Sequence, residues 1–207
     1  MVYRKTQATE ERKEARRRQV LDAATRLFGK HGYHATTVPM IVQEADVSTG
    51  SFYMYFRNKE DVFNAALEEM GHAVAHVMDQ MANAQPDPLK RMSQGAEKLF
   101  MFLAENPEQA RILIVESSGL SPRLDKTRRA ILLQQEEEVR QTMELAPSLF
   151  SVENTVVAAR CVAGATFEAV YCWLEDDPKT RMPAADVARA VARFNTQAVK
   201  RVPTQRK

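Results

Sequence analysis

Apolar residues recur at intervals of three and four along most of this 207-residue chain, and no stretch shows a sustained alternation of apolar and polar residues. Intervals of three and four place side chains on one face of an α-helix, whereas alternation is typical of a half-buried strand. Only seven glycines interrupt the chain. The sequence therefore predicts an all-α protein.

Residues that favour helix N-termini stand directly before several of the periodic runs. They are Thr37, Ser48, Asn58, Asp87 and Ser121. We expect Gly32 to end the first helix in a left-handed conformation. Nine helices are predicted, over residues 11–31, 37–45, 48–56, 58–83, 88–106, 107–117, 121–145, 152–175 and 183–200.

The charge distribution suggests a division of the chain. Residues 1–60 carry 11 Lys and Arg against 7 Asp and Glu, whereas the remainder carries 18 against 20. We predict a first domain over 1–57, with a basic N-terminal arm, and a second over 58–207. A positive end favours a polyanionic partner, although a solvated basic helix face explains the same charge.

The segment TTVPMIVQEADVSTGSFYMYF, residues 36–56, reads as two short helices joined by a tight turn. Together with the longer first helix they predict a helix-turn-helix unit, in which the second short helix enters the major groove of DNA. Phe52, Phe56 and Val47 are placed to hold this helix on its own domain. The small or flat residues predicted to face DNA are Thr49, Gly50, Ser51, Tyr53 and Met54.

Phosphate contacts are predicted at the starts of the short helices. Thr36, Thr37 and Ser48 place hydroxyls and free N–H groups where an anion binds favourably. Lys59 adds a cation nearby, and the hydroxyl of Tyr53 can reach a phosphate. Each hydroxyl residue is also a plausible helix cap, so the two interpretations stay open at this point.

The stretch ATRLFGKHGYHATTVPMIVQEADVSTGSFYMYFRNKEDVFNAALE resembles the DNA-binding region of the TetR family of bacterial transcriptional regulators. The motifs LFxxxGYxATTV, VSxGxxYxYF and NKExxF carry the resemblance, within residues 16–70. Two positions depart from the family pattern: Asp46 replaces the usual turn Gly, and Thr49 stands where many members have Lys. Because Asp tolerates left-handed backbone, we expect the turn to be kept.

The resemblance implies a ligand-responsive repressor that binds a palindromic operator as a homodimer and is released by a small-molecule effector. An activator, or a dimerisation protein of the same fold that does not bind DNA, is the alternative. An enzyme is disfavoured, because the sequence has no Gly-rich phosphate loop, nucleophile elbow or zinc signature.

Dimerisation is predicted through residues 152–175 and 183–200. The first of these segments is apolar on nearly every side, and its small residues, such as Ala163 and Gly164, permit close helix contact. A four-helix bundle with a two-fold mate would bury these surfaces. A central helix in a monomeric core explains the same pattern, so this interpretation is kept beside the first.

The resemblance also places an effector among the helices of the second domain. The candidate lining residues are Phe100, Leu103, Ile114, Gln135, Phe167 and Tyr171. Ordinary positions in a hydrophobic core explain the same residues, so this alternative is kept. Ten methionines suit an adaptable apolar pocket, so we predict a hydrophobic small molecule. We predict no cofactor and no metal, since spacing fixes no third ligand near His72 and His76.

No apolar run approaches the roughly 18–20 residues that cross a bilayer, and the N-terminus lacks the apolar region of a signal peptide. We therefore expect a cytoplasmic protein without a membrane partner. Cys161 and Cys172 lie about three turns apart on one predicted helix, too far for a disulfide. We expect both to be buried free thiols.

Overall fold

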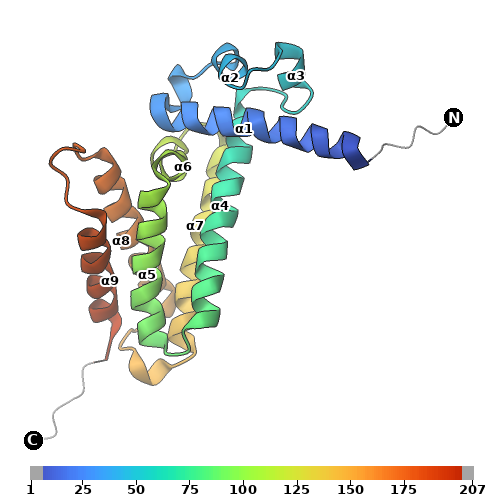
Figure 1. Cartoon of the computed structure of the whole chain (residues 1–207). Helices are drawn as coiled ribbons and strands as arrows, with labels where there is room; N and C mark the ends of the chain where they lie inside the picture. The colour runs from blue at the N-terminus through green and yellow to red at the C-terminus, as the bar shows by residue number, and fades with distance from the viewer. Residues whose placement is uncertain (1–6, 202–207) are drawn as a thin grey trace, which may run out of the picture.

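Three helices at the N-terminal end lie across one end of a helical bundle (Figure 1). The computed structural model describes residues 7–201. The first helix, α1 (Gln7–Ala35), supports α2 (Val38–Glu44) and α3 (Thr49–Tyr53), which occupy the outermost end of the molecule. We call these three helices the head.

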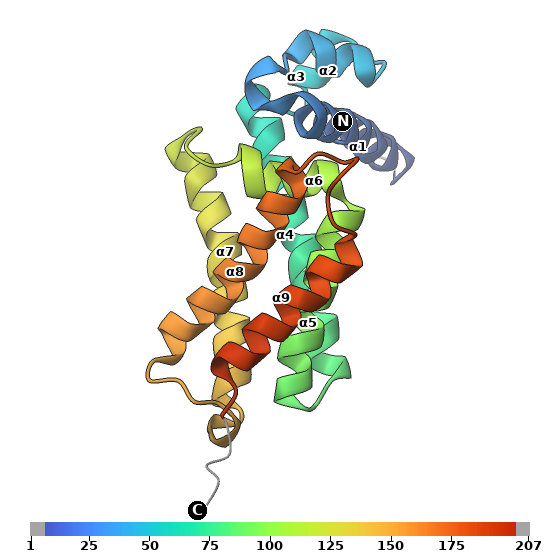
Figure 2. The same cartoon turned by 90° about the vertical axis from the view of Figure 1, so that its left-hand side faces the viewer.

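The bundle begins with α4 (Lys59–Ala84), which runs from the head to the far end of the molecule (Figure 1). Within it α9 packs on α5, and α8 packs on α7 (Figure 2). The remaining elements are α5 (Pro88–Glu105), α6 (Pro107–Arg111), the π-helix η1 (Ile112–Glu116), α7 (Pro122–Glu144), the 3-10 turn η2 (Pro147–Leu149), α8 (Thr155–Glu175) and α9 (Ala184–Val199). The all-α prediction with nine α-helices is confirmed for residues 7–201.

The predicted helix caps are confirmed. The side chains of Thr37, Ser48, Asn58, Asp87 and Ser121 each accept a backbone N–H from the first turn of the helix that follows. The first helix differs from its prediction, because helical structure resumes after a kink at Gly32 and reaches Ala35. Gly32 has φ 80°, a value that the absence of a Cβ makes accessible.

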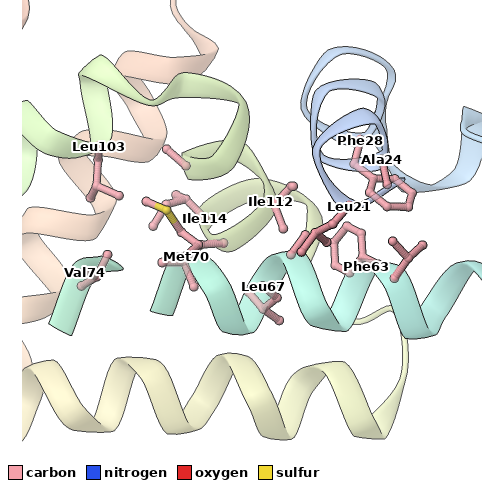
Figure 3. Packing of buried hydrophobic residues seen from close by; sticks show 14 of the residues in the cluster. Leu21, Ala24, Phe28, Phe63, Leu67, Met70, Val74, Leu103, Ile112 and Ile114 are labelled. Atoms are coloured by element: carbon pink, nitrogen blue, oxygen red, sulfur yellow. The ribbon is translucent and has the colours of Figure 1, made fainter. Parts of the chain in front are cut away.

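One hydrophobic core extends from the head into the bundle. Phe28 of α1 meets the ring of Phe63 of α4 edge to face, with ring centroids 4.9 Å apart. Figure 3 shows this contact continuing along α4 through Leu67 and Met70 to Ile112 of η1. The hydrophobic core therefore connects the head with the bundle. The predicted boundary between two domains at residue 57 stays a prediction.

The outer surface of α8 requires two corrections. Cys161 and Cys172 are exposed, so the prediction that they are buried is wrong, although both are free thiols. The helix Thr155–Glu175 is also long and apolar enough to cross a membrane, contrary to the reading of the sequence, and only 28% of its most apolar window is buried within the chain. Both corrections have one cause: the apolar character of α8 extends to a face that no other part of residues 7–201 covers.

Candidate DNA-binding face and ligand site

The turn between α2 and α3 is fixed by backbone hydrogen bonds. The N–H of Val47 donates to the carbonyl of Val42 at 3.0 Å, and Asp46 adopts φ 49°, as expected for a left-handed turn residue. The Nε2 of Gln19 on α1 donates to the carbonyl of Ala45 at 2.7 Å. These contacts set the direction in which α3 leaves the turn.

The two sides of α3 differ as the sequence predicts. Phe52 and Phe56 are buried in the head, whereas Tyr53 is 54% exposed and Met54 is 68% exposed. Thr49 and Gly50 are exposed as well, and Ser51 is partly exposed. The outer side of α3 therefore offers a hydroxyl, an aromatic ring and a flexible apolar side chain to an external partner.

Gly50 has no close neighbour inside the protein. A Cβ added at this position would have the Oγ of Ser48 as its nearest contact, at 4.0 Å. Packing within the chain therefore does not explain a glycine here. A partner that approaches the backbone of α3 closely does explain it, as the sequence suggested.

Thr36 does not face the predicted DNA side. Its side chain is fully buried, and its Oγ1 donates to the carbonyl of Gly32 at 2.8 Å and to that of Leu27 at 3.2 Å. The hydroxyl thus closes the end of α1 instead of meeting a phosphate. Thr37 and Ser48 are exposed at the starts of α2 and α3, and their oxygens act as caps.

The side chain of Lys59 donates hydrogen bonds to backbone carbonyls at the end of α1. Its Nζ donates to the carbonyls of Tyr33 at 2.7 Å and Thr36 at 2.9 Å, and lies 4.2 Å from the centre of the Tyr33 ring. Partial burial lowers the pKa of this ammonium group. The ammonium that the sequence predicts as a phosphate contact is therefore bound to backbone carbonyls at the end of α1, and its contact with DNA stays a prediction.

Among the described residues, several exposed cations lie along the first half of α1. Arg12, Lys13 and Arg16 are exposed there, while Arg17 packs over the Phe56 ring with its guanidinium carbon 5.4 Å from the ring centre. The predicted site residues did not include them individually. The run RKEARRR was the available signal, and it was assigned only to a basic arm.

A cavity lies inside the bundle between α4, α5, α7 and α8, towards the end away from the head. Its volume is about 100 Å³. Apolar side chains dominate its lining, including Met78, Met81, Met92, Leu99, Val139, Val162 and Phe167. Gln135 also lines it, with both polar side-chain atoms buried and without a hydrogen-bond partner among the described residues.

A second hollow is an open cleft of about 540 Å³ between α7 and α8, bounded at one end by η1. Its charged lining residues are Arg128, Arg129, Arg160, Glu136 and Glu168. Glu136 accepts from Arg129 at 3.2 Å and from Arg160 at 3.1 Å. The cleft is therefore richer in positive charge than in negative charge.

The predicted effector residues divide between these hollows and the core. Gln135 lines the cavity, Ile114 and Tyr171 line the cleft, and Phe167 lines both. Phe100 and Leu103 are fully buried in the main core and line neither hollow, so the structure does not place them in a pocket. The three cavity methionines were not predicted individually, although the methionine content of the sequence pointed to an adaptable pocket.

No group of three potential metal-binding side chains occurs within residues 7–201. The Nε2 of His76 lies 2.8 Å from the side-chain amide of Gln80, its neighbour one turn along α4.

The exposed second helix on a braced two-helix unit defines a helix-turn-helix DNA-binding protein. Residues 20–66 match the family model described as bacterial regulatory proteins, tetR family. Residues 20–66 therefore form a DNA-binding domain of the TetR family of bacterial transcriptional regulators.

Two characterised relatives resemble mainly the N-terminal part of the chain. The HTH-type transcriptional regulator HbdR of Aromatoleum sp. (strain CIB) is 36% identical over 86 residues, which are 42% of this chain and 34% of that protein. The fatty acid metabolism regulator protein of Bacillus subtilis is 30% identical over 88 residues, which are 42% of each chain. The matches thus span less than half the length of these relatives.

The fold of the whole chain also has a solved counterpart. The transcriptional regulator FadR from Bacillus subtilis, in complex with stearoyl-CoA, superposes with a TM-score of 0.75 at 21% identity. The match covers 86% of this chain and 97% of that one. At this identity the similarity establishes the fold alone.

Proposed function

We propose that this protein is a ligand-responsive transcriptional repressor in the cytoplasm, which binds a palindromic operator as a homodimer. The observation that carries the proposal is the outer side of α3, where Tyr53 and Met54 are exposed while Phe52 anchors the helix. A helix presented in this way fits the major groove, which admits one helix at a time. Tyr53 and Thr49 supply hydrogen-bonding groups for bases or phosphates.

The dimer is supported by the outer surface of α8 and α9. Val157 of α8 is 54% exposed and Phe194 of α9 is 65% exposed. Gly164 of α8 is exposed as well, with no atom within 4 Å of the position of a Cβ. Contiguous exposed apolar surface marks an interaction site in a protein that is otherwise well packed. Two copies joined here would carry two recognition helices, as a palindromic operator requires.

The effector is a hydrophobic or amphipathic small molecule held in the bundle. The apolar lining of the cavity supports this class, and the similar FadR structure contains stearoyl-CoA. Binding would favour an arrangement of α4 that misplaces the two heads for successive grooves. By linkage, operator DNA must then weaken effector binding by the same factor.

Electrophoretic mobility shift on the DNA upstream of the protein's own gene tests the proposal. Met54→Ala should weaken specific binding at least tenfold, whereas Met182→Ala should not, since Met182 is similarly exposed but lies before α9. Tyr53→Ala should abolish the specific shift while circular dichroism and dimer mass stay unchanged. Absence of any specific shift with the unaltered protein would contradict the proposal.

A further inference from the structure

The cavity inside the bundle and the cleft between α7 and α8 share a wall. Ala163 and Phe167 of α8 line the cavity on one side and the cleft on the other. Ala163 is buried, and Phe167 is only partly buried. Rotation of the Phe167 side chain would therefore connect the two spaces, and we treat them as an inner and an outer compartment of one site.

The inner compartment suits the end of an apolar chain. Its volume of about 100 Å³ is smaller than that of a cavity of about 150 Å³ which takes up benzene. Burial and the nearby charge of Asp79 raise the pKa of the Glu138 carboxyl, which also lines this space. An anionic group is disfavoured beside this carboxyl, whereas the unpartnered amide of Gln135 can bind a carbonyl or hydroxyl.

The outer compartment suits an anionic group. Glu136 accepts hydrogen bonds from both Arg129 and Arg160, which leaves Arg128 as the lining arginine without a carboxylate partner among the described residues. The Nε of Arg128 is buried and has no hydrogen-bond partner there. A buried donor without a partner is costly, and a phosphate or carboxylate would satisfy it with a charge-assisted bond.

We propose that the two compartments bind one amphipathic anion, with its phosphate or carboxylate head at Arg128 and a short apolar tail extending past Phe167 into the inner cavity. This inference rests on the proposed function, because it names the chemical class of the effector. The inner compartment is smaller than a cavity that takes up the six carbons of benzene, so it buries no more than about six carbons of the tail.

The outer compartment is also lined by η1, the element whose last residue contacts the head. Ile114 and Val115 of η1 line the cleft, and the carboxylate of Glu116, the last residue of η1, accepts the backbone N–H of Tyr33 on α1. A single-turn π-helix is a strained arrangement found frequently at functional sites. An anion seated in the cleft therefore lies against the element that touches the head.

Isothermal titration calorimetry on the full-length protein tests the site without DNA. The probes are hexyl phosphate and hexanoate, with inorganic phosphate, acetate and hexan-1-ol as the heads and the tail by themselves. We expect at least one of the two complete amphiphiles to bind tenfold or more tightly than either part. Binding of only hexanoate or only hexyl phosphate identifies a carboxylate or a phosphate head, respectively. No binding of either amphiphile at 1 mM would overturn the proposal.

Two variants of α7 locate the head group. Arg128→Gln should weaken binding of the amphiphile about tenfold or more and leave any binding of hexan-1-ol unchanged. Lys126→Gln removes the same charge two residues away, outside the cleft, and should leave both affinities unchanged. Equal effects of the two variants, or no effect of Arg128→Gln, would contradict the assignment of Arg128.

A third variant tests whether Phe167 forms the wall between the two compartments. Phe167→Ala should shift the preference from the six-carbon amphiphile towards the matching twelve-carbon amphiphile, because the inner cavity and the cleft become continuous. An unchanged chain-length preference would overturn the role given to Phe167. Operator binding by the ligand-free protein is measured separately, so failure of the regulatory function and failure of this ligand site are distinguishable.

Discussion

The carboxylate of Glu116 accepts the backbone N–H of Tyr33 at 2.9 Å, although the two residues are 83 positions apart in sequence. Tyr33 follows the kink of α1 at Gly32, and Glu116 ends η1. A β-carbon at Gly32 would lie 3.0 Å from the Oε2 of Glu116. The contact therefore requires both an unusual backbone conformation and a small residue at the point where bundle and head meet.

Gly32→Ala should destabilise the protein by about 2–3 kcal/mol, because it combines positive-φ strain with crowding of the Glu116 carboxylate. Gly119→Ala is the matched control, since Gly119 also has positive φ but no atom near a Cβ. It should cost about 1–2 kcal/mol. Urea unfolding measures both, and equal losses would show that the contact with Glu116 adds nothing.

Gly50→Ala should separate folding from DNA binding. Among the described residues, the atom nearest to the added methyl group is the Oγ of Ser48 at 4.0 Å, which causes no crowding, so stability should rise by up to about 1 kcal/mol. Specific operator affinity should fall at least tenfold, because the methyl group projects from the side of α3 that approaches DNA. Fluorescence anisotropy gives the affinity, and an unchanged value would argue against close docking of α3.

Lys59→Met should act on stability rather than on phosphate binding. The substitution leaves the carbonyls of Tyr33 and Thr36 without their donor, which should cost about 1–3 kcal/mol. Lys30→Met, at an exposed position of α1, should change stability by less than about 0.5 kcal/mol. A flatter salt dependence of DNA binding for Lys59→Met, with no loss of stability, would contradict this role and indicate that Lys59 contacts a phosphate.

Gly164→Glu should convert the dimer to a monomer. The single chain has open space at this position, so a loss of mass in sedimentation would report contact between chains. Gly164→Ala is the control and should remain dimeric. The exposed thiols of Cys161 and Cys172 give a second readout, because they should react faster with Ellman's reagent in the glutamate variant. An intact dimer with unchanged thiol reactivity would place the interface elsewhere.

Asp61 makes the junction of head and bundle sensitive to acid. Hydrogen bonds from Arg57 and Arg123 hold the pKa of the Asp61 carboxyl far below its usual range. A lowered pKa in the folded state stabilises the protein above the ordinary aspartate pKa, near 3.9, and this stabilisation is lost as pH falls towards the folded pKa.

The stability difference between the unaltered protein and Asp61→Asn should therefore be larger at pH 7 than at pH 3. Urea unfolding at both values measures it, and Asp186→Asn at an exposed pair on α9 is the control. A difference that does not depend on pH would show that the charge of Asp61 contributes nothing to the junction.

Local features of the fold were predictable from the sequence. The caps at Thr37 and Ser48 depend on residues three positions away, and the turn at Asp46 depends on its own conformational preference. Periodicity likewise separates the two sides of α3, because Phe52 and Phe56 are four residues apart. Such signals lie within one or two helical turns and need no knowledge of the tertiary structure.

Features that depend on distant contacts were not predictable. The sequence predicts Lys59 only as a cation near a phosphate, because nothing in it indicates that the carbonyls of Tyr33 and Thr36 lie beside this residue. Phe100 and Phe167 are both aromatic residues on apolar helix faces, yet one fills the core and the other borders two hollows. Periodicity identifies a face but does not distinguish packed core from cavity wall or subunit interface.

Methylation of guanine N7 by dimethyl sulfate tests the central claim, that α3 enters the major groove of operator DNA. N7 lies in the major groove, whereas the adenine N3 that the same reagent modifies lies in the minor groove. The unaltered protein should protect guanines in two half-sites centred about one helical turn apart, and Tyr53→Ala should lose this protection. Specific DNA binding that leaves guanine N7 reactive in both half-sites, or protects only adenine N3, would contradict the account.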